Sequence, residues 1–154
     1  MTPTWRSGQT LRARTRAQAL VEFAMVAPIF FLVLFAMIEG GRFVFYYEML
    51  NNATREGARY AIVNGANSLG CPTGPPAPGS ASCDPAGDDV RDRVRAAAIG
   101  MSGAAITVTP DWIDDNSRGS TVRVEASFTY TTLIPIVPLP PITVTAESSL
   151  VVNN

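Results

Sequence analysis

The chain has 154 residues and a formal net charge of −1, and its twelve basic residues are all arginine. This length allows one modest domain, and a pI near 5.3 argues against a nucleic-acid-binding protein. The absence of histidine and lysine removes the commonest general base, the commonest metal ligand and Schiff-base chemistry. We therefore expect no enzyme, no metal and no cofactor. Catalysis would be limited to carboxylates such as Glu39, Glu48 or Asp111, whose spacing identifies no catalytic pair.

Residues 1–17 contain four arginines and no acidic residue. Residues 23–38 follow as an uninterrupted apolar run, and extension back to Ala17 gives 22 residues broken only by Glu22. As a helix, 22 residues rise about 33 Å, which is enough to cross a bilayer. Only Arg42 closely follows the run, so the positive-inside rule places a basic leader (1–17) in the cytoplasm and everything after Gly40 outside. A cleavable secretory signal is the alternative, but residues 37–40 make a poor cleavage site.

Beyond the span, the expected helix continues to residue 63, which defines an anchor segment at 18–63. The expected buried stripe is Phe43, Tyr47, Leu50, Thr54, Gly57 and Ala61, with a polar stripe of Glu48, Asn52, Arg55 and Arg59 opposite. Four aromatic residues at 43, 45, 46 and 47 fit a membrane interface or ordinary core packing equally well. Gly57 and Ala61 are spaced so that a second helix could approach closely.

Residues 64–87 form a loop rich in glycine and proline that contains both cysteines, Cys71 and Cys83. Two cysteines with eleven residues between them are too few for a closed zinc site and too far apart for a CxxC redox motif. They suit one disulfide in an extracytoplasmic loop.

Residues 88–154 predict a small α+β domain. Asp88 is the expected cap of a short helix running to about Ile99. Alternation of apolar and polar residues predicts strands at 121–130 and 142–150, with a shorter one near 106–108. The fold class is thus α+β: a long N-terminal helix, a short helix and an antiparallel sheet of about three strands.

Two features of this domain leave alternatives open. Residues 114–119 are expected to form the turn between the first two strands, although Asp111, Asp114 and Asp115 could also bind calcium without EF-hand spacing. Residues 133–142 are apolar but contain four prolines, so this segment would cover a core edge or offer a contact patch.

The first half of the chain resembles a known family. Residues 18–28 (QALVEFAMVAP), 39–42 (EGGR) and 53–61 (ATREGARYA) resemble the TadE-like family of pilin-like proteins. The resemblance implies cutting by a prepilin peptidase between Ala17 and Gln18, which makes Glu22 the fifth mature residue. The family usually has glycine where this chain has Ala17. It also implies that Glu22 meets the N-terminus of an adjacent subunit, and that Pro28, Gly57 and Ala61 take part in helix packing during assembly.

The resemblance therefore implies a minor pilin or pseudopilin of a tight-adherence (Flp, type IVc) pilus or secretion apparatus, with a role in adhesion. Its expected partners are the bacterial inner membrane, the prepilin peptidase, other Tad pilins and minor pilins, and the pilus assembly platform. The alternative is an uncleaved, single-span membrane anchor that carries an extracytoplasmic interaction domain.

Overall fold

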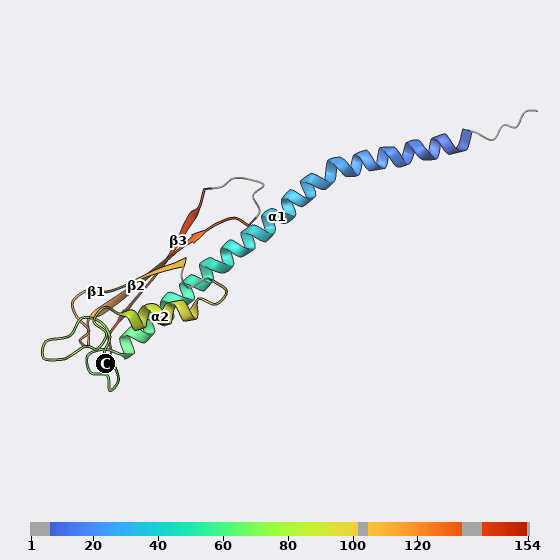
Figure 1. Ribbon diagram of the computed structural model, residues 1–154. Coiled ribbons are helices and arrows are strands. Elements are labelled where there is room, and N and C mark those ends of the chain that lie inside the picture. Colours follow the sequence, from blue (N-terminus) through green and yellow to red (C-terminus); the bar gives the residue numbers. More distant parts are fainter. Residues whose placement is uncertain (1–6, 102–104, 134–139, 154) are drawn as a thin grey trace, which may run out of the picture. The chain divides into compact units, whose positions relative to one another are not determined.

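The computed structural model describes residues 7–101, 105–133 and 140–153 (Figure 1). Its elements run in the order α1 (Ser7–Val63), α2 (Asp88–Ala97), β1 (Ile106–Trp112), β2 (Thr121–Tyr130) and β3 (Ile142–Val151). The expected α+β class is confirmed. The chain divides into two compact units, Met1–Gly41 and Arg42–Asn154, and we call the second the C-terminal unit.

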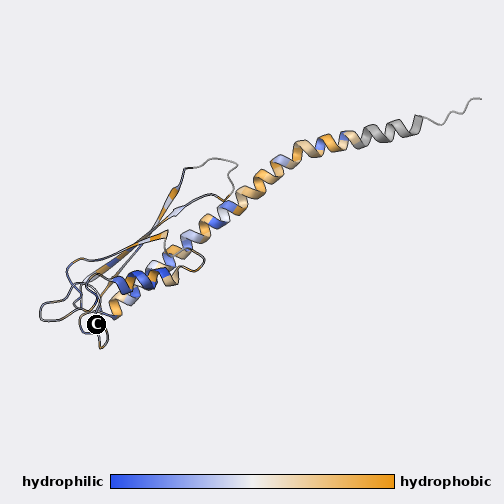
Figure 2. Ribbon diagram, viewed as in Figure 1, coloured by the Kyte–Doolittle hydropathy of each residue, from blue (hydrophilic) through white to orange (hydrophobic). Residues whose placement is uncertain are grey.

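The helix α1 begins at Ser7, well before the expected start of the span at residue 18. Leucine, alanine and arginine favour helix, and they supply eight of the ten residues from Leu11 to Leu20, which explains why the helix extends into the basic segment. Figure 2 shows the apolar stretch that follows along α1. Residues 1–6 of the expected leader lie outside the described residues.

The three strands form an antiparallel sheet in the order β1-β2-β3. In β1, burial alternates perfectly between residues, with Ile106, Val108 and Trp112 among those on the buried face. Period-two alternation has this consequence because successive side chains point to opposite faces. The other face is polar and carries an ion pair between Arg123 and Glu147, with 2.6 Å between Nη2 and Oε2.

The residue 42–63 part of α1 and the helix α2 meet the buried face of the sheet. Val90 and Val94 of α2 are fully buried, as are Val122 and Val124 of β2. An ion pair joins the two helices, with 2.6 Å between Arg93 Nη2 and Glu56 Oε1. The core of the C-terminal unit is therefore three-sided, built from two helices and one sheet.

The loop between α1 and α2 folds against the end of the sheet. The structure joins Cys71 and Cys83 in a disulfide, with 5.7 Å between their Cα atoms. Asn116 is fully buried, and its side-chain amide donates a hydrogen bond to the carbonyl oxygen of Thr73 and accepts one from the amide N–H of Ala77. One side chain from the β1–β2 turn thus organises a loop that lies some forty residues earlier.

Several local predictions need correction. Asp88 does not cap α2: the residue before the helix is Gly87, in the left-handed conformation, and the carboxylate of Asp84 accepts the free N–H groups. Tyr47, expected in the buried stripe, is 45% exposed, whereas its neighbour Tyr46 packs against the core.

The turn expected at residues 114–119 does join β1 to β2. Residues 134–139 of the proline-rich segment lie outside the described residues.

Candidate functional site

The first candidate site is the apolar part of α1. In the described part of the chain, α1 is the one helix long and apolar enough to cross a membrane, and its apolar window is not buried by the rest of the protein. Large side chains such as Phe23, Met25 and Ile29 are 67–71% exposed. An exposed apolar surface of this length needs an apolar environment, because exposure of apolar side chains to water is unfavourable.

The expected processing residues lie at the start of this segment. Ala17, Gln18 and Glu22 are all exposed on α1. The Gln18 side-chain amide donates a hydrogen bond to Glu22 Oε1 at 3.5 Å, so the two side chains share one helix face. Pro28 lies inside α1 and is exposed.

Gly57 and Ala61 lie instead in the core of the C-terminal unit. A Cβ on Gly57 would overlap Cγ2 of Val94 and would lie 3.6 Å from methyl groups of Val90 and Val124. Ala61 has no exposed surface. The helix that approaches this small-residue surface is α2 of the same chain.

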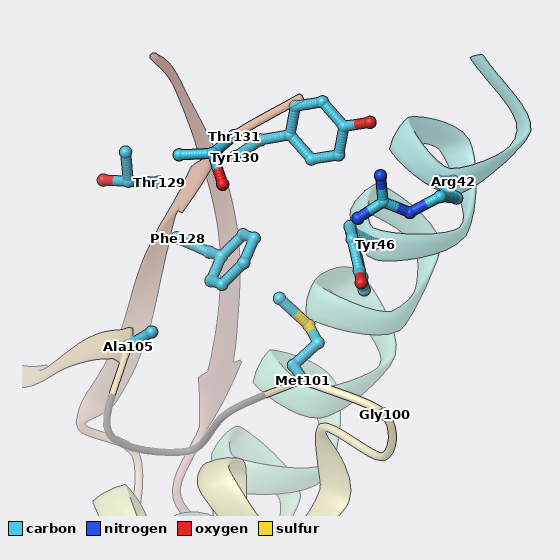
Figure 3. A pocket seen from close by; sticks show the side chains of 9 residues that line it. All are labelled: Arg42, Tyr46, Gly100, Met101, Ala105, Phe128, Thr129, Tyr130 and Thr131. Carbon is cyan, nitrogen blue, oxygen red and sulfur yellow. The ribbon is translucent and has the colours of Figure 1, made fainter. Parts of the chain in front are cut away.

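The second candidate site is a pocket of about 310 Å³ within the C-terminal unit (Figure 3). Arg42 and Tyr46 of α1 face Phe128 and Tyr130 of β2, with Met101 between them. The Arg42 guanidinium carbon lies 5.7 Å from the Tyr46 ring centroid and 5.6 Å from that of Tyr130. These are cation–π distances, so the pocket presents one positive charge among aromatic faces.

The aromatic run that begins at Phe43 is divided between two environments. The Phe43 ring packs edge-on against Tyr130 at 5.5 Å, and Tyr46 lies 5.5 Å from the ring of Phe128. Phe45 and Tyr47 remain 48% and 45% exposed. Phe43 and Tyr46 therefore belong to the core of the C-terminal unit, whereas Phe45 and Tyr47 do not.

The carboxylates considered for catalysis or metal binding do not converge. Among the described residues, no three His, Cys, Asp or Glu side chains are placed to hold a metal ion. The Asp115 carboxylate accepts hydrogen bonds from the Ser117 amide and the Ser120 hydroxyl within the turn. Glu48 and Asp111 are exposed on different elements, and Glu39 lies in the N-terminal unit.

Asp84 is a structural residue that the sequence patterns did not reveal. Its carboxylate accepts hydrogen bonds from the amides of Asp88 and Asp89 and from the hydroxyl of Thr73, at 2.8 to 2.9 Å. Partial burial acts to raise the pKa of Asp84, but these hydrogen bonds favour the charged form more strongly and the pKa lies below its ordinary value. A cap four residues before the helix has no simple spacing signal.

Among the described residues, one apolar helix precedes a small α+β unit, and this arrangement is that of a single-pass, membrane-anchored protein. Residues 17–59 match the family described as TadE-like protein, so the chain carries a TadE-like segment that includes the whole apolar run. The resemblance drawn from residues 18–28 is confirmed over that segment, and it associates the protein with the membrane and with Tad pilus components. Neither a curated protein nor a solved structure matched the chain.

Proposed function

We propose that the protein is a minor pilin or pseudopilin of a tight-adherence pilus or secretion apparatus, acting in assembly and not as an enzyme. The observation that carries the proposal is the TadE-like match over residues 17–59, which includes the proposed processing residues and the whole apolar run. The exposed apolar surface of α1 supports it, because such a surface can be held in a bilayer and then packed against other helices in a filament.

In this proposal a prepilin peptidase of the bacterial inner membrane cuts between Ala17 and Gln18. The new ammonium group, the main-chain nitrogen of Gln18, then stands one helical turn from Glu22, on the helix face where the Gln18 side-chain amide donates a hydrogen bond to that carboxylate. A carboxylate at the edge of the hydrocarbon is costly and favours a charged partner. The N-terminus of an adjacent pilin subunit would provide one.

The four arginines of the leader orient the chain with its N-terminus in the cytoplasm. The C-terminal unit would then face the extracytoplasmic side, where it contacts other Tad pilins and the assembly platform. The Cys71–Cys83 disulfide supports this orientation, because such bonds persist in oxidising compartments.

The decisive experiment is N-terminal sequencing and intact-mass measurement of the membrane-associated protein from cells with and without the prepilin peptidase. We expect a start at Gln18 in the first strain and a retained leader in the second. A Gln18→Pro variant would serve as a cleavage-blocked mass standard. Retention of the leader in both strains would contradict the proposal.

One feature of the sequence favours a second candidate function. The residue before the expected cut is Ala17, whereas TadE-like proteins usually have glycine there. An uncleaved, single-span anchor with an interaction domain would show the retained leader in both strains. An Ala17→Gly variant that becomes cleaved while the natural chain does not would assign the difference to this one residue.

A further inference from the structure

The outer side of β3 leaves backbone hydrogen-bonding groups without a partner strand. β2 lies between β1 and β3, so β1 and β3 are the two edges of the sheet. Just past the end of β3, the Val152 N–H donates a hydrogen bond to the carbonyl oxygen of Ser120, on the β2 side. Successive residues of an antiparallel strand direct these groups to alternate sides, so the even-numbered residues of β3 bond β2. The outward-facing residues, which we call the β3 edge, are Thr143, Thr145, Glu147, Ser149 and Val151.

The opposite edge of the sheet, on β1, is protected against pairing. The Ile113 N–H donates to the carbonyl oxygen of Thr121, so the even-numbered residues of β1 face outward. One of them is Pro110, which has no N–H to donate. Another is Val108, whose carbonyl oxygen accepts a hydrogen bond from Nε of Arg91 in α2 at 3.4 Å. A proline and a covering helix are two ways in which proteins keep an edge strand from pairing.

The β3 edge lacks this protection. β3 has ten residues and no proline, and within the described part of the chain nothing bonds the outward backbone groups of the β3 edge. Its one charged side chain, Glu147, already pairs with Arg123 of β2. At the two ends of β3, Ile142 and Leu150 lie on the same face as the buried Val144 but are 42% and 36% exposed. A long, unprotected edge with apolar surface at its ends is suited to the addition of a further strand.

The sequence of β3 is complementary to itself in the antiparallel direction. When two copies pair about a two-fold axis at Ala146, Ile142 of each copy lies opposite Leu150 of the other. These are non-hydrogen-bonded pairs, in which opposite Cα atoms are about 4.5 Å apart and the side chains are close. Glu147 then lies opposite Thr145, whereas an axis at Glu147 would place two carboxylates opposite each other, which is destabilising. One register therefore covers both apolar ends and separates the like charges.

We propose that the β3 edge pairs with the β3 edge of a second copy of this chain, antiparallel and centred on Ala146, so that the two sheets become continuous. The outward N–H and C=O groups of each copy bond those of the other, and the Ile142 and Leu150 side chains leave water together. The interface is two-fold symmetric, as most homodimer interfaces are. The pairing involves the C-terminal units alone.

The test uses the full chain in detergent, at fewer than one chain per micelle, so that the placement of the membrane span does not limit the pairing. The variants Thr143→Cys and Ser149→Cys each add one thiol at an exposed position of β3. The natural cysteines remain joined in their disulfide under non-reducing conditions. A short bifunctional thiol reagent is added to each variant alone and to an equimolar mixture of the two.

We expect a crosslinked dimer in the mixture, because Thr143 of one copy lies opposite Ser149 of the other. Each variant alone should crosslink poorly, since its two thiols are then six residues apart along the paired strands, or about 20 Å. A mixture that gives no crosslinked dimer would contradict the proposal and leave the edge to a different chain. Equal crosslinking in all three samples would indicate contact in another register, and the proposal would also be wrong.

A second pair of variants tests whether the backbone makes the contact. Thr145→Pro removes an outward N–H and no bond to β2, whereas Thr145→Val keeps that N–H. Added to both cysteine variants, Thr145→Pro should abolish crosslinking in the mixture and Thr145→Val should preserve it, with thermal unfolding as the check on the fold. Undiminished crosslinking in a folded Thr145→Pro protein would exclude strand pairing. If that variant does not fold, the comparison of the mixture with the single variants still decides.

The inference goes beyond the proposed function and rests on neither the cleavage nor the assembly of pili. A failed cleavage test would therefore leave it intact.

Discussion

Gly57 shows how one residue type sets the distance between two helices. Its hydrogen atom faces Val94 of α2, and no larger side chain fits without displacement. Glycine in a helix interior costs about 1 kcal/mol relative to alanine. The close approach of α2 offsets that cost, because the valine methyl groups then pack directly on the α1 backbone.

We expect Gly57→Ala to lower the stability of the C-terminal unit by about 1–2 kcal/mol, because overpacking outweighs the gain in helix propensity. Thermal unfolding in detergent would measure the change. Gly41→Ala is the matched control, since Gly41 lies in the same helix and, in the described part of the chain, an added Cβ there meets no atom within 4 Å beyond its own stretch of helix. A Gly57→Ala protein as stable as this control would contradict the packing argument.

Asp84 and Asp88 distinguish the observed cap from the expected one. Removal of the Asp84 carboxylate leaves the first amides of α2 without their acceptor, so Asp84→Ala should cost about 1–2 kcal/mol. Asp88→Ala should cost less, because Asp88 is exposed and its carboxylate pairs with the guanidinium of Arg91, on the helix surface. Chemical denaturation of both variants measures the difference. Equal losses would argue against Asp84 as the principal cap.

The same carboxylate predicts a pH dependence. The pKa of Asp84 in the folded chain lies below its ordinary value of 3.8, because hydrogen bonds to its charged form outweigh partial burial. Its stabilising contribution is therefore complete above about pH 5 and is lost as pH falls through the lowered pKa. The stability difference between the natural chain and Asp84→Asn should shrink on acidification. A difference that stays constant from pH 7 to pH 2 would contradict this linkage.

Among the elements, those defined by local periodicity were predicted well. Alternation located all three strands: the observed β2 (Thr121–Tyr130) has the expected bounds, β3 (Ile142–Val151) ends one residue later, and β1 (Ile106–Trp112) is longer than the expected 106–108. At the ends of β3, alternation predicted burial that is not observed: Ile142 and Leu150 are 42% and 36% exposed. This strand is at the edge of the sheet, so its ends have neighbours on only one side.

The loop between α1 and α2 has no regular apolar pattern, and its structure depends on the Cys71–Cys83 disulfide that closes it. We expect the double variant Cys71→Ser/Cys83→Ser to unfold about 3 kcal/mol more easily, since an open loop has more conformational freedom in the unfolded chain. Unfolding of the natural chain with and without reductant measures the effect, and the double variant should not respond to reductant. Alkylation that adds mass before reduction would show free thiols instead of a disulfide.

For the whole molecule, two kinds of surface are combined in one chain. The exposed apolar part of α1 needs lipid or other helices, whereas the C-terminal unit buries its own core. The boundary between the two units, after Gly41, falls within a single helix. If the proposed function is right, assembly depends on the first part of α1 and folding of the C-terminal unit on the second, and substitutions should separate the two.

Glu22→Ala tests this separation. We expect normal membrane insertion, because the change removes a charge and preserves the apolar run, but poor incorporation into pili. Quantification of the protein in membranes and in sheared pili measures both. Glu48→Ala, at an exposed position of the C-terminal unit, is the control. Undiminished incorporation of Glu22→Ala would exclude a role for this carboxylate in assembly.

The apolar span, the strand positions and the TadE-like motif could be predicted from the sequence, because each is a pattern of residues that are close together in the chain.

Three features could not be predicted: the residues that contact Gly57, the cap of α2 at Asp84, and which aromatic residues after Gly41 are buried and which are exposed. Asn116 shows why: it bonds to Thr73, 43 residues earlier, and no local pattern relates the two. Contacts of this kind depend on which surfaces meet when α1, α2 and the sheet pack together, and that is a property of the folded chain.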